Sequence, residues 1–551
     1  MKTLLYLLFI CILFPLFSNG QAPTIQWQKS LGGTQGDDAY SVKQTKDGGY
    51  IVAGQTSSGD GDVTGQHHAS TYDYWVVKLS KTGNLVWNKA LGGIDQEAAN
   101  DIEQTSDKGY IVAGYSYSSD GDVTGHHPSG YPSPTADCWI VKLNSTGEIV
   151  WQKSLGGSGD DRAYSIQQTK DGGYIIAGYS NSSDGDVTGN HGGIGVNDYW
   201  VVKTDSTGNI TWEKSLGGTD ADIAESVHQT KDGGYIVAGY ASSNDGDVSG
   251  HHGGSQNKEL DYWVVKLSST GNITWQKTLG GPSSDDAHSI EQTYDKGYIV
   301  AGQTFSVDGD VTGNHGFVDY WITKLNTKGK IQWQKCLGGT GLDVGFSVQQ
   351  TKDSGYVVAG YSNSLDGDVS GNHSSADYWM VKLNSTGSIV WEKSLGGTQA
   401  DNAFSIQQTK DGGYVLAGLA YSDNGDVTGH HGSNQAEDFW VVKLNPAMSP
   451  LNSTANKSYG NSAIIDFYTG DVLFDIAPNP VQSEIRIESN RSLQNALISI
   501  TDLRGKVLFT ATQDLPVSDF ITVPAVSLDP GMYILSVQAG RIKRSMKIIK
   551  Q

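Results

Sequence analysis

The sequence predicts an all-β protein, in which a seven-bladed β-propeller of four-stranded blades is followed by a small C-terminal β-sandwich. The fourteen Trp residues fall into seven pairs, and the second Trp of each pair stands 12 residues before the first Trp of the next. Each repeat holds four short runs rich in β-branched and aromatic residues, which are typical of strands. The chain after residue 20 has no convincing helical periodicity. Four strands in each of seven repeats indicate blades arranged around an axis.

Residues 1–20 predict a secretory signal peptide. Lys2 precedes an apolar run from Leu4 to Phe17, and small and polar residues follow it, so we expect cleavage after Gly20. The run is too short to predict a membrane span, and no later stretch is long and apolar enough to be one. We therefore expect an exported chain without a transmembrane segment in its mature part.

Composition limits the partners. The formal net charge of −21 disfavours nucleic acid and anionic membrane surfaces, and it leaves cations or neutral ligands such as glycans as easier partners. Only Cys138 and Cys336 remain after cleavage, which is too few for a scaffold held by disulfides. Stability must therefore come from burial, and a chain of this length can bury a large core.

Residues 21–445 carry the repeat array. In the third unit the four predicted strands are the runs AYSIQQT, GYIIAGYS, DYWVVKT and NITWEKSL, and turn sequences such as TKDGG and DSTG join them. The array begins with TIQWQKSLGG, a fourth-strand sequence with no unit before it, and ends with DFWVVKLNP, a third-strand sequence with no fourth strand after it. We therefore expect the N-terminal strand to close the last blade, which leaves no open sheet edge.

The loop between the second and third strands of each unit carries the repeated sequence DGDVTGxH. This loop shares one face of the predicted propeller with the connections between blades, and we expect function on this long-loop face. Two interpretations stay open. The Asp side chains could bind Ca²⁺, which takes about six to eight oxygen ligands, or they could accept backbone N–H groups in repeated turns. The candidate Ca²⁺ ligands are Asp62, Asp122, Asp186, Asp247, Asp310, Asp368 and Asp426.

Two further repeated sets are expected on the long-loop face. The first is an acid ten residues after the first Trp of each pair, namely Asp37, Glu97, Asp161, Asp222, Asp285, Asp343 and Asp401. The second is the His that ends the loop sequence, namely His67, His127, His191, His252, His315, His373 and His431. A transition-metal site is disfavoured, because one His per blade would be spread around a wide ring.

Two short segments of each repeat resemble known propeller families. The turn sequence TKDGGY, residues 45–50 in the first unit, resembles the Asp-box of sialidases and related propellers, where it is a structural hairpin. Sialidase activity in that family needs a cluster of arginines, and the array contains one, Arg162. The run KLNSTGEIVW, residues 142–151, is similar to repeats of quinoprotein-type propellers. Both resemblances imply a fold and transfer no active site.

The C-terminal region differs from the array. Residues 446–470, rich in Ser, Asn and Ala, predict a linker, and five of the six Arg lie beyond residue 480. Residues 471–551 resemble the type A sorting domain of type IX secretion cargo, a small β-sandwich that fits alternating runs such as MYILSVQA. The resemblance implies recognition by the outer-membrane translocon, followed by release or surface attachment. The matching residues are Pro478, Asn479, Pro480, Asp502, Gly505, Lys506, Leu528, Pro530, Gly531, Tyr533, Lys547 and Lys550.

Repetition favours binding over catalysis. An enzyme usually needs an asymmetric set of groups, whereas these units are nearly interchangeable. We therefore expect a secreted or cell-surface, non-catalytic protein that binds glycan or protein through the long-loop acidic face, where several weak contacts could add up. Two alternatives remain: a hydrolase or lyase that acts on polysaccharide through carboxylates of the same face, and a structural scaffold without a ligand. No cofactor other than Ca²⁺ is predicted.

Overall fold

The computed structural model describes residues 21–68, 71–129, 134–193, 195–253, 259–432 and 436–447, and in the C-terminal region 474–477, 484–489, 493–502, 506–515, 520–524, 528–529, 531–539 and 542–550. The chain divides into two compact units, Met1–Pro450 and Leu451–Gln551. The predicted signal peptide, and all but the first two residues of the predicted linker, lie outside the described residues.

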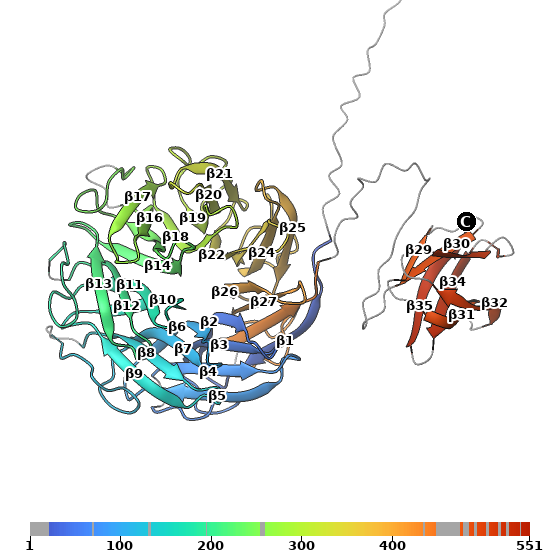
Figure 1. The fold of residues 1–551 in the computed structure, drawn as a ribbon, viewed down its shortest axis with the longest axis horizontal. Helices are drawn as coiled ribbons and strands as arrows, with labels where there is room; N and C mark the ends of the chain where they lie inside the picture. The colour runs from blue at the N-terminus through green and yellow to red at the C-terminus, as the bar shows by residue number, and fades with distance from the viewer. Residues whose placement is uncertain are drawn as a thin grey trace, which may run out of the picture. The chain divides into compact units, whose positions relative to one another are not determined.

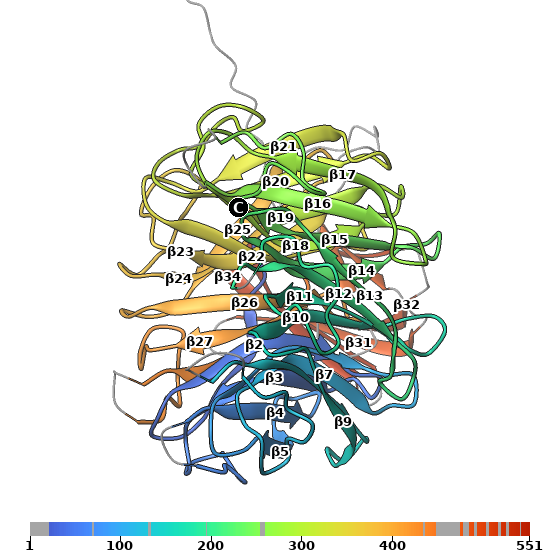
Figure 2. The same cartoon turned by 90° about the vertical axis from the view of Figure 1, so that its left-hand side faces the viewer.

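The first unit is a ring of seven four-stranded antiparallel sheets, so the predicted propeller is confirmed (Figure 1). From the side, the blades follow one another in chain order, from the blue first blade through the green fourth to the yellow sixth (Figure 2). Neighbouring inner strands contact one another around the axis. The inner strands are β2 (Asp37–Gln44), β6 (Glu97–Gln104), β10 (Asp161–Gln168), β14 (Asp222–Gln229), β18 (Asp285–Gln292), β22 (Asp343–Gln350) and β26 (Asp401–Gln408).

The next two strands of each blade are buried along almost their whole length, because each blade packs both faces against its neighbours. The second strands are β3 (Tyr50–Thr56), β7 (Tyr110–Ser116), β11 (Tyr174–Ser180), β15 (Tyr235–Ala241), β19 (Tyr298–Thr304), β23 (Tyr356–Ser362) and β27 (Tyr414–Ala420). The third strands are β4 (Asp73–Leu79), β8 (Asp137–Leu143), β12 (Asp198–Thr204), β16 (Asp261–Leu267), β20 (Asp319–Leu325), β24 (Asp377–Leu383) and β28 (Asp438–Leu444).

The N-terminal strand closes the ring as predicted. The outer strands of the first six blades are β5 (Leu85–Leu91), β9 (Ile149–Leu155), β13 (Ile210–Leu216), β17 (Ile273–Leu279), β21 (Ile331–Leu337) and β25 (Ile389–Leu395). The last blade has the order β1-β28-β27-β26, in which β1 (Ile25–Leu31) is the outer strand. Its Gln28 Oε1 accepts a hydrogen bond from Trp440 Nε1 at 2.9 Å. No blade is therefore left with an unpaired third strand.

Aromatic side chains hold neighbouring blades together. Trp139 is fully buried on the third strand of its blade, and Tyr74 of the preceding blade packs on it with 4.6 Å between ring centroids. The Tyr74 hydroxyl donates a hydrogen bond to the Trp139 carbonyl at 2.8 Å. The same Tyr-to-Trp contact recurs at four further junctions, and Phe439 replaces Tyr against Trp75. These large rings contribute much of the burial that stabilises the ring of blades.

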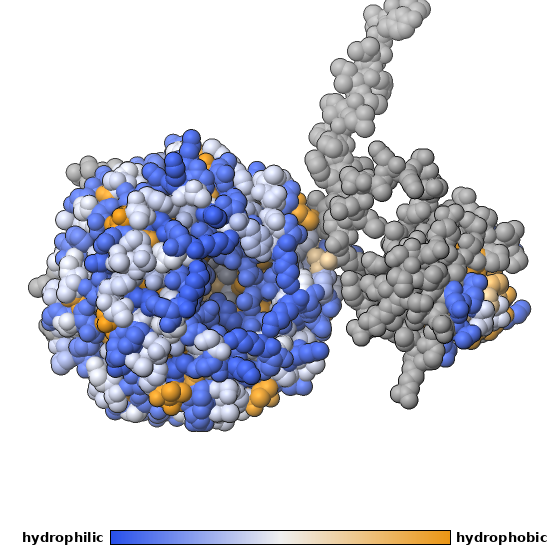
Figure 3. Space-filling model, viewed as in Figure 1, coloured by the Kyte–Doolittle hydropathy of each residue, from blue (hydrophilic) through white to orange (hydrophobic). Residues whose placement is uncertain are grey.

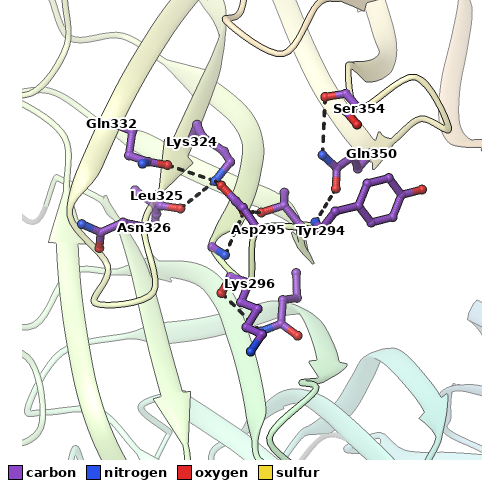
Figure 4. Close-up of polar contacts among 12 residues, drawn as sticks. Tyr294, Asp295, Lys296, Lys324, Leu325, Asn326, Gln332, Gln350 and Ser354 are labelled. Carbon is purple, nitrogen blue, oxygen red and sulfur yellow. Dashed lines mark hydrogen bonds and ion pairs between the residues drawn. The ribbon is translucent and has the colours of Figure 1, made fainter.

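The Asp-box turn is structural in this chain. In the fifth blade, the buried Lys324 ammonium donates to Asp295 Oδ2 at 2.9 Å and to the Leu325 carbonyl at 3.0 Å (Figure 4). The amide of Tyr294 reaches the next blade, where it donates to Gln350 Oε1 at 2.6 Å. Each turn therefore ties its own hairpin to the neighbouring inner strand. This agrees with the structural hairpin that the Asp-box resemblance implies.

The C-terminal unit contains two antiparallel sheets, in the orders β29-β30-β33 and β32-β31-β34-β35. Alternate apolar residues of both sheets are buried, including Ile485 and Ile487 in one and Ile498, Ile500 and Leu535 in the other, as the predicted β-sandwich requires. The strands are β29 (Phe474–Ala477), β30 (Glu484–Ser489), β31 (Leu493–Asp502), β32 (Val507–Leu515), β33 (Phe520–Pro524), β34 (Gly531–Ala539) and β35 (Ile542–Lys550).

Candidate functional site

Every inner strand of the propeller contains a β-bulge at the same position. In the first blade the pairing of β2 with β3 shifts between Ala39 and Ser41, so that Tyr40 has no partner on the neighbouring strand. A bulge of this kind bends the strand and redirects the side chain of its extra residue. The seven bulge residues are Tyr40, Asn100, Tyr164, Glu225, His288, Phe346 and Phe404.

All seven bulge residues line one cavity of about 480 Å³, and every inner strand contributes to its wall. The cavity therefore lies on the axis of the ring. The hydrophilic face in Figure 3 is hollowed at its centre. A volume of this size falls within the range of small-molecule pockets. Because the bulge residues differ between blades, this cavity is asymmetric although the blades are alike.

One side of the cavity is a continuous aromatic wall, built by four consecutive blades. The imidazole of His288 stacks on Phe346 with 4.7 Å between centroids, and Phe346 meets Phe404 edge to face at 5.0 Å. Phe404 in turn contacts Tyr40 at 5.6 Å. Such a wall offers flat apolar surface to a ligand.

The opposite side is polar and includes Arg162. Its guanidinium lies 4.2 Å from the Tyr115 ring centroid and donates to the Tyr117 hydroxyl at 2.6 Å. Arg162 Nε also donates to Asp160 Oδ2 at 3.0 Å. Because these partners occupy the guanidinium, Arg162 serves to hold this wall together and its charge is already compensated.

Burial in the cavity shifts the ionisation of several groups. Desolvation, with a smaller contribution from Asp286, raises the pKa of Glu225 to about 8. Desolvation also raises the pKa of Glu291 to about 7 and lowers the pKa of His228 and of His288 to about 4. Both imidazoles are therefore neutral at neutral pH.

The residues three positions after the bulge form a rim that is mostly structural. Gln167 Oε1 accepts the amide N–H of Gln229 in the next blade at 2.6 Å, and Glu103 Oε2 accepts that of Gln168 at 2.6 Å. Equivalent bonds are made by Glu291, Gln349 and Gln407. Lys43 takes this position in the first blade and lies 3.6 Å from Asp101 Oδ1.

The predicted Ca²⁺ ligands lie on the surface of the long-loop face, each partly exposed. Asp122 Oδ2 lies 3.4 Å from His67 Nε2 of the preceding blade, and Asp62 is similarly placed against His431 at 3.8 Å. Asp247 and Asp310 make the same contact, and Asp186 Oδ2 accepts the Gly156 amide at 3.3 Å. Asp368 and Asp426 occupy the equivalent loop positions. No group of three or more His, Cys, Asp or Glu arranged to hold a metal occurs among the described residues. Calcium binding stays a prediction.

The seven predicted His residues share one contact. In each, Nδ1 lies within hydrogen-bond distance of Oδ2 of a buried Asp on the third strand of its own blade, at 2.7 to 3.0 Å, as in His252 and Asp261. The His amide N–H bonds to the same carboxylate oxygen, as in His252 at 2.7 Å. The imidazoles therefore anchor the loops to the blades.

The acids ten residues after the first Trp are inside the protein and not on its surface. Asp37 is fully buried, and Asp37 Oδ2 accepts the Gly33 amide at 2.8 Å and the Ser58 hydroxyl at 2.9 Å. The other six sites are built in the same way. This placement corrects the expectation that they form a ring on the long-loop face, and the physical reason is that they fix the turn between blades.

The sorting-motif residues are partly described. Gly531, Tyr533, Lys547 and Lys550 lie on β34 and β35, and the buried Tyr533 donates its hydroxyl proton to the Asp529 carbonyl at 2.8 Å. Pro478, Asn479, Pro480, Gly505 and Pro530 lie outside the described residues.

Sequence reasoning did not identify the cavity, although its signal is visible in the alignment of the repeats with one another. The residue three positions after each buried acid changes from blade to blade while its neighbours barely change. A variable residue that stands directly between two nearly constant ones, Ala and Ser in most blades, is therefore the sequence signal of the cavity lining.

Fold and C-terminal region together define an exported β-propeller protein. Residues 475–551 match the secretion system C-terminal sorting domain. Such a domain implies export by a type IX secretion system to the cell surface or the medium. Among the described residues, no helix is long and apolar enough to cross a membrane.

Individual proteins are more distantly similar. The chain is 23% identical over 579 residues to the regulatory protein FlaEY of Caulobacter vibrioides, covering 95% of this chain and 60% of that protein. It therefore spans about 60% of the length of this curated relative.

Among solved structures, the chain is similar to PorZ, a surface component of the type IX secretion system of Porphyromonas gingivalis. The identity is 11% and the TM-score is 0.39, and the match covers 95% of this chain and 60% of that one. BamB from Moraxella catarrhalis has 12% identity and a TM-score of 0.35, covering 76% of this chain and all of that one.

Proposed function

We propose that the protein is an exported, non-catalytic carbohydrate-binding propeller whose ligand occupies the central cavity. The asymmetry of the cavity supports this proposal: a run of aromatic rings from His288 to Tyr40 faces a side with carboxylate and amide groups. Sugar rings present apolar faces that stack on aromatic side chains, and their hydroxyls bond to carboxylates and amides. The proposal moves binding from the long-loop face, where the sequence predicts it, to the axis.

Substitution of the aromatic wall tests this proposal. In the full chain from residue 21, Phe346→Ala removes the ring that contacts both His288 and Phe404. We expect glycans that bind the wild type on an array to lose about tenfold or more in affinity, measured by calorimetry. Thermal unfolding checks that the variant is folded.

The matched control is Phe317→Ala, because Phe317 is 66% exposed outside the cavity, in the loop that carries the DGDVTGxH sequence. We expect this variant to bind as the wild type does. Binding that depends on Phe317 and is insensitive to Phe346 would return the site to the long-loop face, and no binding to any glycan would contradict the proposal.

A polysaccharide hydrolase is the second candidate, and one observation favours it. A carboxyl group whose pKa is raised to about 8, as that of Glu225 is, is protonated at neutral pH and could act as a general acid. Release of reducing ends from the glycans that bind, lost in Glu225→Gln, would establish this function in place of simple binding.

A further inference from the structure

The charges in the cavity point to one kind of ligand. Four carboxyl groups line it, namely those of Asp101, Glu103, Glu225 and Glu291. Asp101 and Glu103 have Lys43 nearby, and Lys231 and Lys43 act on Glu291. Glu225 differs from these three, because the only charged side chain that perturbs its pKa is another acid, Asp286. Glu225 therefore has no cation among the described residues to stabilise its ionised form, and a cationic ligand can supply one.

Glu225 is also open to a ligand. It is a bulge residue, so its backbone makes no pair at that position on β15, and its side chain lines the cavity. No hydrogen bond of its carboxyl group is found among the described residues, whereas Glu103 and Glu291 each accept an amide N–H. A carboxylate that is removed from bulk water and accepts no hydrogen bond is stabilised most by a cationic partner.

The rings on both sides of Glu225 in the bulge series strengthen this preference. Tyr164 precedes it and His288, stacked on Phe346, follows it. The faces of aromatic rings attract an ammonium group. An anionic sugar would find no cation beside Glu225 in the described part of the chain, and the net charge of −21 would oppose its approach.

We infer that the cavity binds an amino sugar with a free ammonium group, which pairs with Glu225 while the sugar ring stacks on the aromatic wall. This inference rests on the proposed function and names the ligand class. The groups that would face the ammonium are the Glu225 carboxylate, the neutral imidazole of His288 and the Tyr164 ring. One ligand then contacts both features of the site, the Glu225 carboxyl group and the aromatic wall.

Calorimetry with two matched oligosaccharides tests the inference. The probes are a tetramer of β-1,4-linked glucosamine and its fully N-acetylated counterpart, which differ in charge and share a backbone. We expect the full wild-type chain to bind the amine form about tenfold more tightly, and Glu225→Gln to remove that preference. Phe346→Ala should weaken the binding of both tetramers. Proton release on binding the amine, seen in buffers of different ionisation enthalpy, should be lost in Glu225→Gln.

The matched control variant is Glu148→Gln, since Glu148 lies on an exposed turn outside the cavity. Equal binding of the two tetramers, unchanged in Glu225→Gln, would overturn the inference and leave carbohydrate binding intact. Failure of both tetramers while other glycans bind would also overturn it. Failure of every glycan would contradict the proposed function itself. A lysine-rich peptide that binds through Glu225 when neither tetramer does would assign the ammonium to a protein ligand and overturn the amino sugar.

Discussion

Two buried carboxyl groups meet at each junction between blades, and the fifth blade shows the pattern. Asp285 and Asp261 are fully buried, and a side chain built on Gly280 would clash with Oδ2 of the first and Oδ1 of the second. Glycine is therefore required here by close approach. Asp261 Oδ2 bonds to His252, whereas its Oδ1 is buried and accepts no hydrogen bond among the described residues. Equivalent Oδ1 atoms in the other six blades are in the same state.

These pairs predict that the propeller is more stable at mildly acidic than at mildly alkaline pH. Burial, with a further contribution from Asp261, raises the pKa of Asp285 from 3.8 to about 7, and similar shifts affect Asp37, Glu97 and Asp222. The unfolded chain loses these protons at a lower pH than the folded chain does. The free energy of unfolding therefore falls as pH rises from about 4 to about 7. We expect the melting temperature to fall over that range.

Asp261→Asn provides the test at one junction. The amide can place a donor where Oδ1 now faces Asp285, and it removes a like charge. We expect the free energy of unfolding to increase by about 1 kcal/mol at a pH of about 8 and to change little at a pH of about 5. The control is Asp205→Asn on an exposed turn, where other blades carry Asn144, Asn326 and Asn384; it should leave stability unchanged over this range. An equal loss of stability at both pH values in Asp261→Asn would contradict the assignment.

At the scale of elements, closure by β1 carries the largest consequence. The strand pairs with β28 from Ile25 to Leu31, and the Asn445 amide donates to the Thr24 carbonyl at 2.9 Å. Without β1, the edge of β28 and one side of the fully buried Trp440 would meet solvent.

A chain that begins at residue 32 is therefore expected to melt many degrees below one that begins at residue 21, and to associate through the exposed edge. Thermal unfolding and size-exclusion chromatography measure both effects. A chain that begins at residue 24 keeps all of these contacts and serves as the control. Indistinguishable melting of the three chains would show that β1 contributes little to the ring.

The sequence predicts the strands far better than it predicts the cavity, for a physical reason. In the third unit the predicted runs match β10, β11, β12 and β13 closely, because alternating apolar residues and Gly-rich turns are local signals. The bulge at Tyr164 depends instead on which residue of β10 fails to pair with β11. That choice is made between strands, so no pattern within either strand indicates it.

The buried position of the acids that follow the first Trp of each pair is the other difference between expectation and structure. The sequence places Asp37 in a loop-adjacent position, and loops usually lie on the surface. Its carboxyl group is fully buried because it accepts bonds from Gly33 and Ser58 and thereby fixes the connection between blades. Short motifs such as LGG and DGD indicate a turn. They do not indicate which nearby carboxylate oxygens accept the hydrogen bonds of that turn.

At the scale of the whole molecule, the sorting domain implies that the propeller is exported to the cell surface or the medium. In a bacterium with a type IX secretion system, removal of residues 475–551 should leave the protein inside the outer membrane, while the full chain reaches the surface or the medium. Fractionation followed by immunoblotting measures the distribution. Asp426→Asn, a change confined to a partly exposed propeller loop, should be exported normally. Export of the shortened chain would contradict the role of the domain.

The bulges also bear on how such proteins diverge. A bulge residue makes no ladder pair, so replacing it leaves the strand pairing of the sheets in place, although it removes ring contacts between blades such as that of Phe346 with Phe404. Seven positions can therefore change one at a time while the ladder of each sheet is kept. Among gene copies descended from a common ancestor, the lining of the cavity can drift at these seven codons long before the Trp and Asp positions tolerate any exchange.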